Sequence, residues 1–135
     1  MEPLSFYHIA IKTPDLDETV QFYRQYCNAD VVKRQYVTEE DDTSQVEYIV
    51  LSIADKLVYL FEEAPYESAG YLTDVENGFL HFGIVVDDLD SVTENLRTDG
   101  IDIIMGPEIF GDLKIAFFTD PAGVRIEILE HQSAP

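Results

Sequence analysis

The sequence predicts an α+β fold made of two tandem βαβββ modules. Short apolar runs with period-two alternation indicate strands, and each half of the chain contains one stretch with helical periodicity. The chain also repeats itself. His8-Ile-Ala-Ile matches His81-Phe-Gly-Ile, and the helix start Asp15-Leu-Asp matches Asp88-Leu-Asp. Such a repeat indicates that one structural unit occurs twice.

The ends of the two modules are duplicated as well, since Val58-Tyr-Leu-Phe-Glu matches Ile126-Glu-Ile-Leu-Glu. Between the modules lies a stretch without periodicity that contains Pro and Gly, which is typical of a linker. We therefore expect one domain over residues 1–135, with a first module at about 5–62, a linker at 63–78 and a second module at about 79–130.

In the first module, a strand is predicted at 5–12, followed by a helix that starts around Thr13-Pro-Asp. Proline suits the first turn of a helix, and the acidic residues there favour the positive end of its dipole. The apolar stripe of this helix comprises Leu16, Val20, Tyr23 and Cys27, so the single cysteine is expected in the core. Three more strands are predicted at 31–37, 46–53 and 57–61.

The second module repeats this order. A strand is predicted at 79–86, and Asp87-Asp-Leu-Asp-Ser starts a helix that runs to about Thr98. Asp99-Gly100 is expected to end that helix. Three more strands are predicted at 101–105, 113–119 and 124–130, with turns at Gly106-Pro107 and Asp120-Pro-Ala-Gly.

The charge is strongly negative, with 27 acidic against 8 basic residues and a formal net charge of −19. The lysines are scattered singly, so nothing predicts a nucleic-acid or an anionic-membrane partner. An acidic surface of this kind is typical of a high-salt cytoplasm. The N-terminus does not resemble a signal peptide, and one cysteine excludes an internal disulfide. We expect a halophilic, cytoplasmic protein.

The chemistry is predicted to lie on three strands. Glu127 stands between the aliphatic residues Ile126 and Ile128, and a carboxylate taken out of water needs a partner. His8 and His81 occur in similar strand settings. We expect His8, His81 and Glu127 to converge on one metal ion. Two imidazoles and one carboxylate suit Fe, Mn, Zn or Ni and leave coordination positions open.

This combination resembles the vicinal oxygen chelate superfamily, which contains glyoxalase I, extradiol dioxygenases, and fosfomycin- and bleomycin-resistance proteins. The resemblance rests on three motifs in this order: His8-Ile-Ala-Ile before an Asp-Leu-Asp helix start, Gly78-Phe-Leu-His-Phe-Gly-Ile, and Asp120-Pro-Ala-Gly-Val-Arg-Ile-Glu-Ile. It implies paired modules that form a curled mixed sheet, a glyoxalase-like cup, in which the first and fourth strands of each module lie side by side. His8, His81 and Glu127 match ligand positions of the family, whereas Tyr59 departs from the four-ligand pattern.

The resemblance implies a metal-dependent enzyme that acts on a small substrate with vicinal oxygens, of the lyase/isomerase or the dioxygenase type. Glu127 is the candidate catalytic residue, and Tyr59, Phe61 and Phe110 are candidates for substrate binding. The alternatives are a bleomycin-resistance-like binding protein without catalysis and a module with a vestigial site. A homodimer is expected, with each cup formed within one chain or across two.

Two further carboxylates, Glu62 and Glu130, fall on the strand face opposite Tyr59 and Glu127 because side chains alternate along a strand. They are expected to be surface residues rather than ligands. His131 is expected to follow the last strand and to be exposed.

Overall fold

The computed structural model describes residues 1–38, 45–63, 79 and 81–132. The chain divides into two compact units, Met1–Asn77 and Gly78–Pro135. Each unit has the order βαβββ, as the sequence repeat predicts. Residues 64–78 of the predicted linker lie outside the described residues. Among the described residues, no helix is long and apolar enough to cross a membrane.

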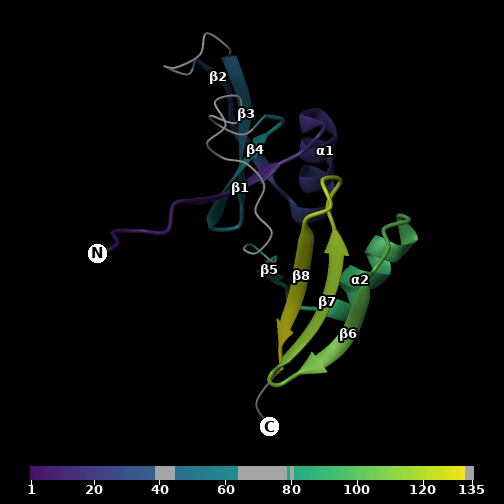
Figure 1. Cartoon of the computed structure of the whole chain (residues 1–135). Helices are drawn as coiled ribbons and strands as arrows, with labels where there is room; N and C mark the ends of the chain where they lie inside the picture. Colours follow the sequence, from purple (N-terminus) through teal and green to yellow (C-terminus); the bar gives the residue numbers. More distant parts are fainter. Residues whose placement is uncertain (39–44, 64–78, 80, 133–135) are drawn as a thin grey trace. The chain divides into compact units, whose positions relative to one another are not determined.

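The first unit holds a four-stranded sheet in the order β1-β4-β3-β2 (Figure 1). Its elements are β1 (His8–Lys12), α1 (Leu16–Cys27), β2 (Asp30–Thr38), β3 (Gln45–Ile53) and β4 (Lys56–Phe61). β1 and β4 pair in parallel and the other strands pair antiparallel. The first and fourth strands therefore lie side by side, as the family resemblance implies.

The second unit has the same topology, with the sheet order β5-β8-β7-β6 (Figure 1). Its elements are β5 (Phe82–Val85), α2 (Leu89–Thr98), β6 (Met105–Phe110), β7 (Leu113–Thr119) and β8 (Arg125–His131). β5 and β8 again pair in parallel. In each unit the helix packs against its own sheet, α1 on β3 and α2 on β6, β7 and β8.

Both helices begin as the acidic starts predict. The Asp15 carboxylate accepts a hydrogen bond from the backbone N–H of Glu18 at 3.0 Å, and the Asp88 carboxylate accepts one from Ser91 N–H at 3.1 Å. These are N-caps, which satisfy backbone donors that the first helical turn leaves unpaired.

A second carboxylate also bonds to each helix start. Glu62 Oε1 accepts a hydrogen bond from Leu16 N–H at 3.1 Å, and Glu130 Oε1 accepts one from Leu89 N–H at 2.9 Å. Both glutamates stand at or just after the end of the fourth strand of their unit. Glu62 is exposed and Glu130 half-buried, which agrees with the expectation of surface residues. Each of them also ties the fourth strand to the helix of the same unit.

The cores form between helix and sheet. α1 buries Leu16, Thr19 and Tyr23, and Tyr23 is fully buried. Cys27, expected in the core, is only half-buried. Thr19 takes a buried place instead because its hydroxyl hydrogen-bonds Thr13 at 2.7 Å.

One predicted strand is wrong. Residues 101–104 are not a strand, and β6 begins at Met105 and runs through the predicted Gly106-Pro107 turn. Gly106 has φ 94°, and a Cβ there would lie 2.4 Å from the Ile115 carbonyl oxygen of β7. A register shift between Met105 and Glu108 lets the two strands stay paired around the proline, whose peptide bond is cis.

The strand ends differ by smaller amounts. β1 and β5 are shorter than the predicted strands at 5–12 and 79–86. β8 extends to His131, which is exposed as expected but belongs to the strand because it pairs with Leu113 of β7.

Candidate functional site

His81 and Glu127 come together in the second unit. His81 directly precedes β5, and Glu127 lies in the middle of the neighbouring strand β8. His81 Nε2 and Glu127 Oε1 are 3.8 Å apart, and the two side chains are 28% and 18% exposed. This separation exceeds a hydrogen bond, so the two groups face each other without bonding directly.

Gly83 makes room for the carboxylate. It pairs with Glu127 across the β5–β8 ladder, and a Cβ at residue 83 would lie 3.0 Å from Glu127 Oε1. Contacts this short are tighter than ordinary van der Waals packing, so a side chain here would press on the carboxylate. The glycine therefore allows Glu127 to lie against β5, on the same strand face as His81.

The equivalent pair in the first unit is His8 and Tyr59. Their rings stack with centroids 4.0 Å apart. The Tyr59 ring also stacks on Tyr48, with centroids 5.6 Å apart. His8 Nδ1 is buried and has no hydrogen-bond partner among the described residues. A buried imidazole nitrogen without a partner is costly, which fits an atom that serves to hold a ligand.

Tyr59 is a neutral hydroxyl rather than an anionic ligand. Its Oη lies 2.8 Å from the Tyr7 hydroxyl, and this hydrogen bond, with desolvation as a lesser cause, raises the pKa of Tyr59 to about 12. At neutral pH the group is fully protonated. It therefore supplies no anion at the position equivalent to Glu127.

The spacing of His81 and Glu127 is compatible with two ligands of one divalent transition metal. A nitrogen at about 2.1 Å and an oxygen at about 2.2 Å from one zinc ion can be at most about 4.3 Å apart, and the 3.8 Å between His81 and Glu127 falls within this limit. No group of three His, Cys, Asp or Glu side chains suited to a metal occurs in the described parts of the chain. The predicted donors instead occur as His81 with Glu127 in one unit and as His8, stacked on Tyr59, in the other.

The predicted substrate-binding residues lie in different places. Tyr59 and Phe61 both belong to the aromatic face of the first unit, and Phe61 stacks on Tyr48 at 5.4 Å. Phe110 ends β6 and is 70% exposed, and it does not line the cavity described next.

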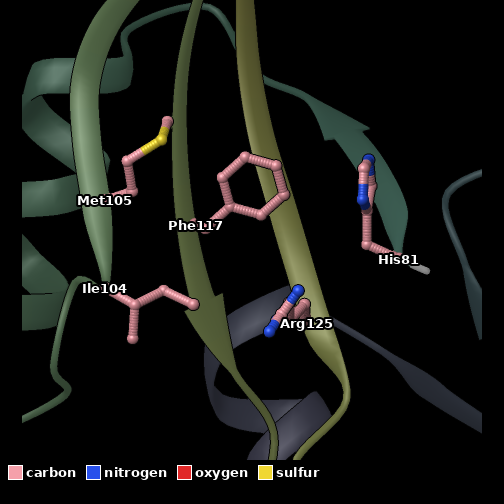
Figure 2. A pocket seen from close by; sticks show the side chains of 5 residues that line it. All are labelled: His81, Ile104, Met105, Phe117 and Arg125. Carbon is pink, nitrogen blue, oxygen red and sulfur yellow. The ribbon is translucent and has the colours of Figure 1, made fainter.

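A cavity of about 300 Å³ opens on the second unit (Figure 2). It is lined by His81, Ile104, Met105, Phe117 and Arg125. Of these, the sequence points only to His81. The other four come from three strands or their ends, and only the strand register brings them together: Met105 pairs with Phe117, and Phe117 pairs with Glu127. A sequence signal exists for Arg125 alone, which stands two residues before Glu127 and so on the same strand face.

A family model described as the Glyoxalase/Bleomycin resistance protein/Dioxygenase superfamily matches residues 5–128. The chain belongs to this superfamily. The match covers nearly all of both modules, which agrees with the paired βαβββ units and their parallel first and fourth strands. The resemblance to the vicinal oxygen chelate proteins is confirmed.

Members of the superfamily with curated names include a probable lactoylglutathione lyase of Synechocystis, which is 29% identical over 93% of this chain and 95% of its own length. A probable chloroplastic lactoylglutathione lyase of Arabidopsis thaliana is 28% identical over 95% of this chain. The chain spans 36% to 45% of the length of the Arabidopsis and Brassica relatives it matches.

Among solved structures, the fosfomycin resistance protein FosX of Listeria monocytogenes is similar to this chain, with a TM-score of 0.72 and 18% sequence identity. The match covers 98% of this chain and 96% of FosX. At this identity the likeness shows the shared fold.

Proposed function

We propose that this protein is a metal-dependent enzyme that acts on a small substrate with two adjacent oxygens, with His8, His81 and Glu127 as the protein ligands. The observation that carries the proposal is the facing pair of His81 Nε2 and Glu127 Oε1, which are 3.8 Å apart and not hydrogen-bonded. The unpartnered Nδ1 of His8 supports the third ligand. Fe, Mn, Zn and Ni all suit this donor set, and FosX of Listeria monocytogenes has been solved with Mn(II).

The reaction that these residues support best is a proton transfer of the lyase or isomerase type. A divalent metal would supply a Lewis acid for the two substrate oxygens. Glu127 is a largely buried carboxylate beside that position, suited to accept a proton from the adjacent carbon. Tyr59 keeps its proton because of its raised pKa, so it can donate a hydrogen bond to a substrate oxygen. The name of the Synechocystis relative, lactoylglutathione lyase, is consistent with this class.

A dioxygenase-type reaction is less well supported. It would need a further acid-base histidine, and the remaining histidine, His131, is exposed at the end of β8. A fosfomycin-type thiol transfer is disfavoured by Ala10, which stands where a hydroxyl residue is expected.

A binding protein without catalysis is the second candidate, and one observation favours it. The first unit carries a face of contacting aromatic rings made by Tyr7, His8, Tyr48, Tyr59 and Phe61. Flat apolar ligands stack on such surfaces. In that case His8 would be part of an aromatic wall and the protein would need no metal.

Metal analysis of single histidine variants decides between the two. We expect protein purified without chelator to hold one transition metal per site, and His8→Ala and His81→Ala each to lose it, because each removes one of only three protein ligands. His131→Ala is the matched control and should keep the metal. Metal content is measured by elemental analysis after dialysis, with circular dichroism to confirm folding.

The outcomes separate cleanly. Wild-type protein that stays metal-free under metal supplementation rules out the enzyme and leaves the binding protein. Retention of metal by His8→Ala alone rejects the contribution of the first unit and restricts the site to His81 and Glu127.

We also infer that the protein is a homodimer, because superfamily members are often dimeric and large apolar side chains lie exposed on the second unit. These include Val85, Met105, Ile109 and Phe110, which are 38% to 70% exposed. Sedimentation equilibrium in molar salt should give the mass of two chains, and a mass of one chain contradicts the inference.

A further inference from the structure

The cavity on the second unit has two chemically different sides. Ile104, Met105 and Phe117 form an apolar wall, and Arg125 lies beside the Phe117 ring with His81 toward β5 (Figure 2). At about 30 Å³ per water molecule, the volume of about 300 Å³ corresponds to roughly ten waters. This is the lower end of the range for small-molecule sites. The cavity therefore suits a compact ligand with an apolar part.

The strand register places this cavity next to the proposed metal ligands. Arg125 and Glu127 are two residues apart on β8, so both side chains leave the same face of the sheet. Phe117 pairs directly with Glu127, and Met105 pairs with Phe117. Arg125, Glu127 and Phe117 thus lie on neighbouring positions of one sheet face, with Met105 one strand further along.

Arg125 differs from the other arginines whose contacts are known. Arg34 bonds to Asp17 at 3.0 Å and to Glu47 at 2.7 Å, and Arg97 donates to the Gly106 carbonyl oxygen at 3.2 Å. Within the described residues, Arg125 makes no ion pair and no side-chain hydrogen bond. Arg24 also has no such partner among these residues, so Arg125 is set apart by its place in the fold. Its side chain is exposed and lines the cavity beside the apolar wall.

We propose that Arg125 binds an anionic group of the ligand, such as a carboxylate, phosphonate or sulfonate, while Ile104, Met105 and Phe117 contact its apolar part. The planar guanidinium presents two parallel N–H donors, which match the two oxygens of such a group. Because the chain is so acidic, a small anion needs a local cation to be held against the general repulsion. The substrate class is therefore a small organic anion whose adjacent oxygens reach His81 and Glu127. This last step rests on the proposed metal-dependent function, whereas anion binding at Arg125 does not.

The test compares two probes of nearly the same shape, benzoate and the neutral benzamide, on metal-free protein at the lowest KCl concentration at which circular dichroism shows it folded. Binding is followed by chemical shifts of backbone amides in ¹H–¹⁵N spectra. We expect benzoate to shift amides around Met105, Phe117 and Arg125 and to bind about tenfold more tightly than benzamide, which lacks the charge. Added KCl should lower the affinity for benzoate and leave the affinity for benzamide almost unchanged, because salt screens only the charged interaction.

Three variants make the assignment specific. Arg125→Gln should lower the affinity for benzoate by about tenfold and leave the affinity for benzamide unchanged. Arg125→Lys should lower the affinity for benzoate less, because lysine keeps the charge and loses only the paired donors. Arg24→Gln, the same charge change on α1, should have no effect. Equal affinities for the two probes, absence of binding by both, or unchanged benzoate affinity in Arg125→Gln would each overturn the proposal.

The result is independent of the metal test. If the wild type binds no metal and benzoate still requires Arg125, the anion site stands and the metal-dependent function falls. If the metal site is present and Arg125→Gln binds benzoate as well as wild type does, the metal-dependent function stands and the anion site at Arg125 falls. Metal content of Arg125→Gln, expected to equal that of wild type, links the two experiments.

Discussion

Replacing Glu127 by Gln lowers the affinity for a divalent transition metal by about 100-fold or more. Loss of a group that merely orients a ligand costs about 10- to 100-fold, and Glu127 is proposed as a ligand itself. It is also the only anion in the proposed set, since Tyr59 is neutral with a pKa of about 12. The Gln side chain keeps the size of Glu and offers an amide oxygen, so only the charge is lost. The affinity is measured by competition with a chelator of known strength.

Two variants show whether the effect belongs to the site. Glu94→Gln makes the same charge change on an exposed position of α2 and should leave metal affinity unchanged. Gly83→Ala keeps every ligand but adds a Cβ at 3.0 Å from Glu127 Oε1. We expect Gly83→Ala to weaken metal binding by about tenfold with little loss of stability, since the carboxylate can move aside and alanine costs less backbone entropy on folding than glycine. Unchanged metal affinity in Glu127→Gln rejects Glu127 as a ligand.

Transfer from molar KCl to low salt lowers the free energy of unfolding by several kcal/mol. Like charges about 10 Å apart in water repel each other by about 0.4 kcal/mol per pair, and the formal net charge is −19. The screening length grows from about 3 Å at 1 M salt to about 30 Å at 0.01 M. Most repulsions between like charges are therefore screened in molar salt, and few are screened in dilute buffer. We infer from this charge that the protein works in a high-salt cytoplasm. Thermal unfolding followed by circular dichroism across a KCl series measures the effect.

A neutral solute separates screening from other salt effects. Sucrose stabilises proteins by exclusion from their surface and does not screen charge. Screening predicts that stability rises steeply at the first additions of KCl and that sucrose cannot replace them. If stability in dilute buffer equals that in molar KCl, the inference of a halophilic protein is wrong.

Local patterns predicted the elements that local interactions build. Both helices begin at the predicted aspartates because an acidic side chain can cap the first turn wherever the helix lies in the fold. The failed strand at 101–105 shows the limit. Its apolar residues suggest a strand, but of this stretch only Met105 belongs to β6. Gly106, in the predicted turn, lies within the strand and permits a close approach to β7. That approach depends on residues about ten positions further along the chain.

The candidate site divides in the same way. The repeat in the sequence pointed to His81 and Glu127 as neighbours, and the parallel pairing of β5 and β8 brings their side chains to 3.8 Å. The role of Gly83 as space for the carboxylate could not be predicted, because a glycine in a strand has many uses and only the cross-strand partner reveals this one. The hydrogen bonds of Glu62 and Glu130 to the helix starts could not be predicted for a similar reason. Their partners lie 46 and 41 residues away.

Local sequence patterns were enough to predict the duplicated βαβββ order, the superfamily and the ligand candidates, because repeats, capping residues and alternation act over a few neighbouring residues. Which side chains share a surface depends on the folded chain. The tertiary structure set Arg125 beside an apolar wall, left it without an ion pair among the described residues, and aligned that wall with Glu127 through the register of three strands. Strand register arises from contacts between distant segments. A cavity whose lining residues are brought together by that register can therefore be found only in the folded structure.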